Sequence, residues 1–263
     1  EALDLFGKVP DNAPSYEKAL AYVGVCHYKL DAYAQANAAF DAYLNQFLKD
    51  PLRASTDPRV LAKRQEARAT ATFYWGLSAY QQAAAGGDWQ KVIDVLQGFA
   101  DEFPRQDAFA PAAMYRVLMA QQNLKREQEV EKTYARMLEL FPDSSWTGRA
   151  ATDIYGGLRA ERETLLEKDP ARARKLLYDM ARYMKVSNDA SSGAPFANLR
   201  LESMHWVELG EWATAEEVLR RIQSRFGKGA EADTVRRNVV PDLGKARYYQ
   251  KKVVERLAVR KST

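Results

Sequence analysis

Apolar positions recur every three to four residues over residues 19–47, and the recurrence is interrupted once, near Asp31. This spacing predicts two amphipathic helices that fold back on each other as a hairpin. Gly24 and Ala36 have little or no side chain, so the two backbones can approach closely there, and Phe40 is expected to fill the space toward a following hairpin. The predicted apolar faces comprise Leu20, Val23, Gly24, His27, Tyr28, Ala36, Phe40 and Tyr43. So large an apolar surface predicts a unit that must stack on others like it.

The same pattern recurs four more times along the chain. The predicted first helices cover residues 58–84, 108–123, 146–167 and 196–209. The predicted second helices contain residues 92–104, 127–141, 170–183 and 215–227. Pro58 after Asp57 is typical of a helix start, and Pro104 and Pro142 are expected to stop second helices. Residues 185–195 are predicted to form a loop, and a last helix is predicted over residues 243–259.

The first hairpin resembles the tetratricopeptide repeat (TPR) family. Gly24, Ala36 and Phe40 stand at the spacing of the consensus W-x2-L-G-x2-Y, A-x3-F, P. Three positions depart from that consensus: Leu20 for Trp, His27 for Tyr and Leu48 for Pro. The resemblance implies an all-α right-handed solenoid of antiparallel helical hairpins. It also implies a non-catalytic scaffold or adaptor that binds a partner helix or peptide in its concave face, without a cofactor, as part of a larger assembly.

The resemblance divides the chain into three parts. Residues 1–14 are expected to be the tail of a truncated upstream repeat, residues 15–229 to hold about five TPR-like hairpins, and residues 230–263 to form a basic capping-helix region. The stretch FPDSS at residues 141–145 is similar to repeats of bacterial cell-envelope scaffold proteins. This similarity implies the periplasm or cell envelope, with the cytoplasm as the alternative.

The family lines the inner surface of its superhelix with first-helix positions beside the consensus core. Mapped onto this chain, the implied groove residues are Val25, Tyr28, Phe73, Leu77, Tyr80, Tyr115, Met119, Gln122, Arg200 and Met204. Large aromatic side chains dominate the energetics of protein interfaces, which favours a groove for an apolar partner segment. The alternative is that these side chains are packed between repeats. Ala21 and Val25 replace the Lys and Asn that clamp C-terminal carboxylates in chaperone-binding relatives, so an acidic-tail ligand is not expected.

Positive charge is concentrated at the C-terminal end. Residues 236–263 hold nine basic and two acidic residues, a charge of +7, so the rest of the chain carries −3 of the total +4. The basic residues of interest are Arg236, Arg237, Lys245, Arg247, Lys251, Lys252 and Arg256. Three interpretations follow: a solvated cap helix, a docking surface for an acidic partner protein, or an adaptor for nucleic acid or an anionic surface. Tyr248 and Tyr249 would allow stacking on bases in the last case.

Few residues could carry chemistry. His27 and His205 are the only histidines and Cys26 is the only cysteine, which excludes an internal disulfide and most metal or catalytic-triad arrangements. His27 is expected to be a packed, hydrogen-bonded side chain. The sequence therefore predicts no catalytic residue, metal or cofactor. An enzyme is the third functional class, after a scaffold and an adaptor for nucleic acid, and hydrolytic turnover that is lost on mutation of His27 or His205 would support it. No apolar run approaches the roughly 18 to 20 residues that a bilayer span requires.

Overall fold

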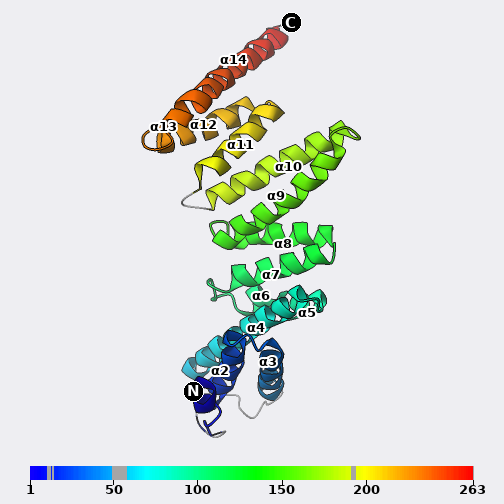
Figure 1. The fold of residues 1–263 in the computed structure, drawn as a ribbon, viewed down its shortest axis with the longest axis vertical. Helices are drawn as coiled ribbons and strands as arrows, with labels where there is room; N and C mark the ends of the chain where they lie inside the picture. The colour runs from blue at the N-terminus through cyan, green and yellow to red at the C-terminus, as the bar shows by residue number, and fades with distance from the viewer. Residues whose placement is uncertain (11–12, 14, 49–57, 191–193, 263) are drawn as a thin grey trace. The chain divides into compact units, whose positions relative to one another are not determined.

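The computed structural model describes residues 1–10, 13, 15–48, 58–190 and 194–262, and these parts contain helices and no strand (Figure 1). The predicted all-α fold, built from antiparallel helical hairpins in a solenoid-like arrangement, is confirmed. The chain divides into two compact units, Glu1–Phe141 and Pro142–Thr263, each of which is described by itself. No helix in the described ranges is long and apolar enough to cross a bilayer.

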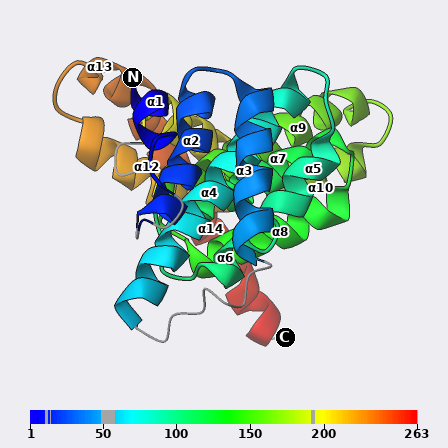
Figure 2. The ribbon, with the colours of Figure 1, turned by 90° about the horizontal axis from the view of Figure 1, so that it is seen from below.

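The first unit contains three helical hairpins behind a short leading helix. Its helices are α1 (Ala2–Phe6), α2 (Tyr16–Lys29), α3 (Tyr33–Leu48), α4 (Pro58–Ala84), α5 (Trp89–Leu96), α6 (Phe99–Glu102), α7 (Ala110–Asn123) and α8 (Glu127–Leu140). Helix α2 contacts α3 and α4, α4 contacts α5 and α7, and α7 contacts α8. Seen from its end in Figure 2, this unit shows α1, α2 and α3 side by side. Hairpins therefore stack in chain order.

The second unit continues the same construction within its own bounds. Its helices are α9 (Ser145–Leu165), α10 (Pro170–Asp189), α11 (Phe196–Leu209), α12 (Trp212–Phe226), α13 (Ala232–Thr234), a π-helical turn η2 (Val235–Val239) and α14 (Val240–Ser262). Each long helix contacts the next, from α9 to α10, α11, α12 and finally α14. The core between them includes Leu177, Leu199, Leu219 and Ile222, all buried.

Four hairpins reverse direction with the same backbone hydrogen bond. In each turn an N–H donates to the carbonyl oxygen five residues earlier, at 2.9 Å. The four donor and acceptor pairs are Ala32 to His27, Gly87 to Gln82, Arg126 to Gln121 and Glu211 to Trp206. The residue directly before each donor has a positive φ. These residues are Asp31, Gly86, Lys125 and Gly210. This is the geometry of a Schellman-type helix end, and it shows a structural repeat where the side chains differ.

Close approach at small residues, predicted for the first hairpin, is confirmed. A Cβ added at Gly24 would overlap the ring of Phe40, and one added at Gly76 would overlap the side chain of Leu96. Phe40 and Leu96 are both fully buried. Phe40 also belongs to a cluster that includes Ala71 of α4, so it packs toward the following hairpin as expected.

Three boundaries differ from the predictions. Helix α10 extends to Asp189, although residues 185–189 were expected in a loop, because the buried Asn188 side chain donates hydrogen bonds to α11. The second helix of the second hairpin is broken at residues 97–98 into α5 and α6, where Gly98 lowers helix propensity. Helix α14 begins at Val240, because Pro241 is tolerated in a first turn that needs no N–H from it.

The close contact at Gly24 leads to a stability prediction. Gly24→Ala and Gly76→Ala are each expected to lower the free energy of unfolding by about 1–3 kcal/mol, because the added methyl forces Phe40 or Leu96 out of place. Gly157→Ala in α9 is the matched control: a Cβ there meets no atom within 4 Å, so the better helix former should stabilise by about 0.5–1 kcal/mol. Urea unfolding followed by circular dichroism measures all three. If Gly24→Ala stabilises the protein as much as Gly157→Ala does, the added methyl does not clash with Phe40 and the prediction is wrong.

Candidate functional site

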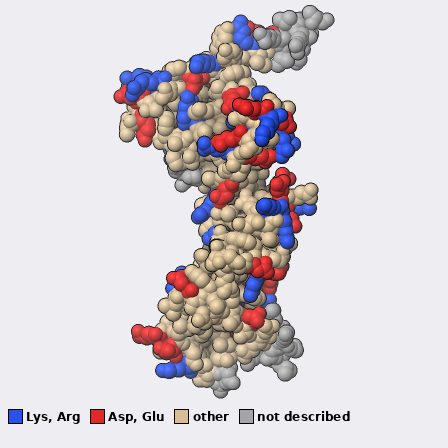
Figure 3. All heavy atoms as spheres, turned by 45° about the vertical axis from the view of Figure 1, so that its right-hand side comes forward, with Lys and Arg blue, Asp and Glu red and all other residues tan. Residues whose placement is uncertain are grey.

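Six of the predicted groove residues are half-buried on the first helices of the first unit. They are Val25 and Tyr28 on α2, Leu77 and Tyr80 on α4, and Met119 and Gln122 on α7. Helix α4 contacts both α2 and α7, so these positions belong to three adjacent helices. Figure 3 shows that the face of this unit visible in that view is largely free of Lys, Arg, Asp and Glu. Partial exposure of large side chains is what a preformed interaction surface requires.

Ring contacts connect the first helices. Tyr28 of α2 lies edge-on to Tyr74 of α4, with ring centroids 5.3 Å apart, and the Lys29 ammonium lies 5.7 Å from the Tyr74 centroid. On α7 the Arg116 guanidinium lies 4.5 Å from the centroid of Tyr80. Neither Tyr74 nor Arg116 was predicted from the sequence. The adjacent aromatic pair Phe73 and Tyr74 could have indicated that one ring is buried. Neighbouring residues on a helix point about 100° apart, so only one of the two can face a groove.

Two predicted groove residues are packed inside the unit instead. Phe73 is 7% exposed and stacks on Phe109, with centroids 4.4 Å apart and planes 10° apart; its ring also lies 6.0 Å from Phe99. It therefore belongs to the core between α4, α6 and the start of α7. Tyr115 is 2% exposed on α7. For these two side chains the alternative of packing between repeats holds.

In the second unit the predicted groove residues lie on α11. Met204 is 50% exposed and offers an apolar side chain to solvent. Arg200 is half-buried and forms an ion pair with Asp242 of α14, with Nη2 and Oδ2 2.5 Å apart. Arg200 therefore holds α14 against α11, and of the two only Met204 presents a large exposed surface.

Buried polar groups join α9, α10 and α11. Glu202 on α11 is 1% exposed; its carboxylate accepts hydrogen bonds from Asn188 Nδ2 at 2.8 Å and from Trp206 Nε1 at 3.4 Å. Burial raises the pKa of the Glu202 carboxyl, since desolvation penalises its charged form. Tyr155 of α9 shares a 3.0 Å hydrogen bond with His205, whose pKa burial lowers. These polar atoms hold neighbouring helices together, which is a structural use.

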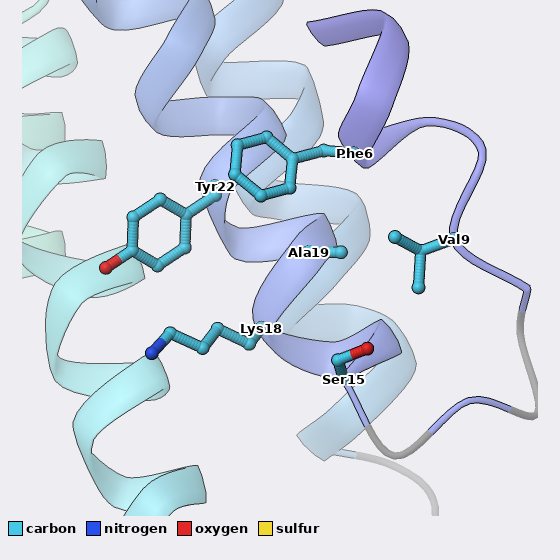
Figure 4. A pocket seen from close by; sticks show the side chains of 6 residues that line it. All are labelled: Phe6, Val9, Ser15, Lys18, Ala19 and Tyr22. Carbon is cyan, nitrogen blue, oxygen red and sulfur yellow. The ribbon is translucent and has the colours of Figure 1, made fainter. Parts of the chain in front are cut away.

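An open cavity of about 380 Å³ lies where α1 meets α2 (Figure 4). Its lining comprises Phe6, Val9, Ser15, Lys18, Ala19 and Tyr22. The rings of Phe6 and Tyr22 lie 5.6 Å apart, and the Lys18 ammonium lies 5.7 Å from the Tyr22 centroid. Such a lining suits an aliphatic or aromatic side chain. Elsewhere among the described residues no group of three or more His, Cys, Asp or Glu side chains could hold a metal ion.

Much of the positive charge predicted for the C-terminal region is paired with carboxylates. Arg247 contacts Glu216 at 3.0 Å, and hydrogen bonds from Arg220 and Arg247 lower the pKa of Glu216. The other pairs are Lys245 with Asp242 at 3.5 Å, Lys252 with Glu255 at 3.1 Å and Arg236 with Asp233 at 3.5 Å. Arg237 and Lys251 are exposed, and the Arg256 side chain lies outside the described residues. Carboxylates interleaved with the cations reduce the attraction for a polyanion.

The buried carboxyl generates a pH prediction. The folded-state pKa of Glu202 is raised, so the folded chain binds this proton more tightly than the unfolded chain. The contribution of Glu202 to the free energy of unfolding must therefore fall as pH rises from the ordinary glutamate pKa through the raised one, by about 1.4 kcal/mol for each unit of the shift. Glu202→Gln removes this dependence, so the wild type should gain stability relative to the variant as pH falls from 8 to 5.

Denaturant melts of the two proteins across that pH range measure the difference, and the titration of His205 cancels because both proteins contain it. Glu217→Gln on α12 is the control for losing one exposed carboxylate. A difference between wild type and Glu202→Gln that does not change with pH would show that Glu202 titrates alike in both states.

Burial of Tyr115 gives a second prediction. Tyr115→Ala is expected to destabilise the first unit by about 3–5 kcal/mol, as other large-to-small core substitutions do. Met204→Ala, at a half-exposed position, should stay within about 0.5 kcal/mol of the wild type. Equilibrium unfolding measures both changes. A Tyr115 variant as stable as the Met204 variant would show that Tyr115 is not a core residue.

No family model matches the chain, and no curated protein matches it in sequence. Among solved structures the chain is similar to the assembly chaperone of RpL4 (Acl4, residues 1–338), with 16% identity, a TM-score of 0.35 and coverage of 98% of this chain and 91% of that one. A likeness of this size transfers no function. The cell-envelope location expected from the FPDSS stretch gains no support from these comparisons.

Proposed function

We propose that this chain is a non-catalytic, TPR-like scaffold that binds a helix or an extended peptide of another protein. Two features support the TPR-like assignment: the small-to-large contacts of Gly24 with Phe40 and Gly76 with Leu96, and the turn hydrogen bond shared by four hairpins. Stacked helical hairpins present continuous surfaces whose positions are set by the neighbouring repeat. Repeat proteins use such extended surfaces to bind other proteins.

The observation that carries the proposal is that half-buried side chains occur on three adjacent first helices, α2, α4 and α7; we call these side chains the row. Tyr28, Leu77 and Met119 come from three adjacent first helices, and none of them is fully buried or fully exposed. A partner helix laid across this row would remove the remaining apolar area from water. Burial of a fully exposed side chain of this size contributes about 1.5–3 kcal/mol to binding. Each of these three side chains would contribute less, because part of its surface is already buried.

Cations over aromatic rings support a fixed binding surface. Lys29 stands over Tyr74, and Arg116 stands over Tyr80. Such contacts hold ring orientations before a partner arrives, which lowers the entropy lost on binding. Support for a non-catalytic role comes from Glu202 and His205, whose hydrogen bonds join helices to one another.

A position-specific crosslinking experiment tests this function. A photoreactive phenylalanine analogue replaces Leu77 or Met119 in the full chain, and in a control it replaces Lys132, which is exposed on the second helix α8. Irradiation in cells that express the protein should give one recurrent protein adduct at positions 77 and 119 and none at 132. Mass spectrometry identifies that protein, and its purified form is then used in titrations.

Leu77→Ser together with Met119→Ser should weaken binding of the purified partner by at least tenfold, because central apolar contacts dominate interfaces. Lys132→Ser should leave the affinity unchanged. Melting temperatures confirm that the variants are folded. Adducts of equal yield at all three positions, or unchanged affinity of the double variant, would refute the first-helix face as the binding surface.

A further inference from the structure

Helix α14 of the second unit (Figure 1) has both buried and exposed apolar side chains. Leu243 and Ala246 are buried on its inner side, where α14 contacts α12 and η2. Large apolar side chains on α14 are nevertheless exposed, including Tyr248 at 58% and Tyr249 at 45%.

Four side chains form a stripe along the exposed part of α14. Lys245, Tyr248, Tyr249 and Lys252 stand at positions i, i+3, i+4 and i+7, which places them on one side of a helix. The contacts agree, because the Tyr248 and Tyr249 rings lie 5.3 Å apart and the Lys252 ammonium lies 5.9 Å from the Tyr248 centroid. We call these four residues the Lys–Tyr stripe.

The stripe is anchored to the body of the unit. Tyr249 stacks on Trp212 at the start of α12, with ring centroids 4.6 Å apart and planes 23° apart. The Tyr249 ring is therefore held in one orientation by an element other than its own helix. A pre-oriented aromatic ring loses little entropy when a partner covers it.

Charge decides which occupant fits. Lys245 and Lys252 have only exposed or partly exposed partners on their own helix, Asp242 at 3.5 Å and Glu255 at 3.1 Å, and such pairs are weak enough to exchange for a partner's carboxylates. A second copy of the stripe would oppose lysines to lysines, which disfavours self-association. Asp242 and Glu255 alternate with these lysines, and this alternation matches the separated charges of a protein helix better than the continuous charge of a phosphate backbone.

We propose that the Lys–Tyr stripe of α14 docks an acidic amphipathic helix of another protein. The apolar residues of that helix would lie on Tyr248 and Tyr249, and its Asp or Glu residues at the flanks would pair with Lys245 and Lys252. Helix-on-helix docking continues the stacking by which the unit is built, and one apolar stripe with charged flanks suffices for it. The Lys–Tyr stripe shares no residue with the proposed binding surface on α2, α4 and α7, so the two proposals stand or fall independently.

A designed probe tests the stripe. The probe is a fluorescent 21-residue peptide with Leu at one helical stripe and Glu at the flanking positions, titrated with the full chain at low and high salt. A second peptide has Lys in place of every Glu. The Glu peptide should bind and lose affinity as salt rises, because the flanking pairs are exposed, whereas the Lys peptide should not bind.

Two variants locate the binding. Lys245→Gln with Lys252→Gln should weaken the Glu peptide about three- to tenfold, the effect of losing two exposed pairs. Tyr248→Ala should weaken it further, and because Tyr248 is largely exposed the variant should fold normally. Arg236→Gln with Arg237→Gln, which removes the same charge outside the stripe, should leave the affinity unchanged.

Several results would overturn the proposal. These are the absence of binding by the Glu peptide, an equal loss of affinity in the Arg236 and Arg237 variant, and stripe-dependent binding of a uridine oligonucleotide tighter than that of the Glu peptide. Sedimentation that shows a dimer abolished by Tyr248→Ala would assign the stripe to a second copy of this chain and would also overturn it.

Discussion

Contact between a residue without a side chain and a large buried residue sets the distance between the two helices of a hairpin in the first unit. Phe40 occupies the place where a Cβ of Gly24 would lie, and Leu96 does the same at Gly76. Interhelical distance at these points is therefore fixed by hard contact rather than by average hydrophobic attraction. With the two helices of a hairpin so close, the connecting turn must be short, and the repeated hydrogen bond from an N–H to the carbonyl five residues earlier supplies it.

The second unit adds a different kind of attachment. Asn188 and Glu202 join α10 to α11, Tyr155 and His205 join α9 to α11, and Arg200 and Asp242 join α11 to α14. Buried polar pairs contribute modestly to net stability but penalise every packing in which a partner is lost. Helices α9, α10 and α11 are thus held in one register by groups that are costly to bury unpaired. The partly buried pair of Arg200 with Asp242 attaches α14 to α11.

The sequence predicted most of the helices because their ends carry local signals. Pro58 begins α4 and Gly210, in a left-handed conformation, follows α11, and both helices have the predicted bounds. Gly98 and Pro241 account locally for two of the boundaries that differ from the predictions, whereas distant contacts decided two other outcomes. Residues 185–189 have a loop-like composition, yet Asn188 bonds with Glu202 on the next helix and keeps α10 helical. The consensus spacing predicted Phe73 in the groove, but Phe73 is buried and stacks on Phe109, 36 residues later. The periodicity of a helix cannot predict contacts with residues that are distant in the sequence.

Division of the chain into Glu1–Phe141 and Pro142–Thr263 affects how its thermodynamics must be measured. The cluster around Phe40 and Tyr43 lies wholly in the first unit, and the cluster around Leu199 and Leu219 lies wholly in the second. Because each unit has a hydrophobic cluster of its own, the chain can unfold in two transitions, and a single all-or-none analysis would average over them. Trp75 and Trp89 belong to one unit and Trp146, Trp206 and Trp212 to the other, so single-tryptophan proteins would let fluorescence assign each transition to its own core.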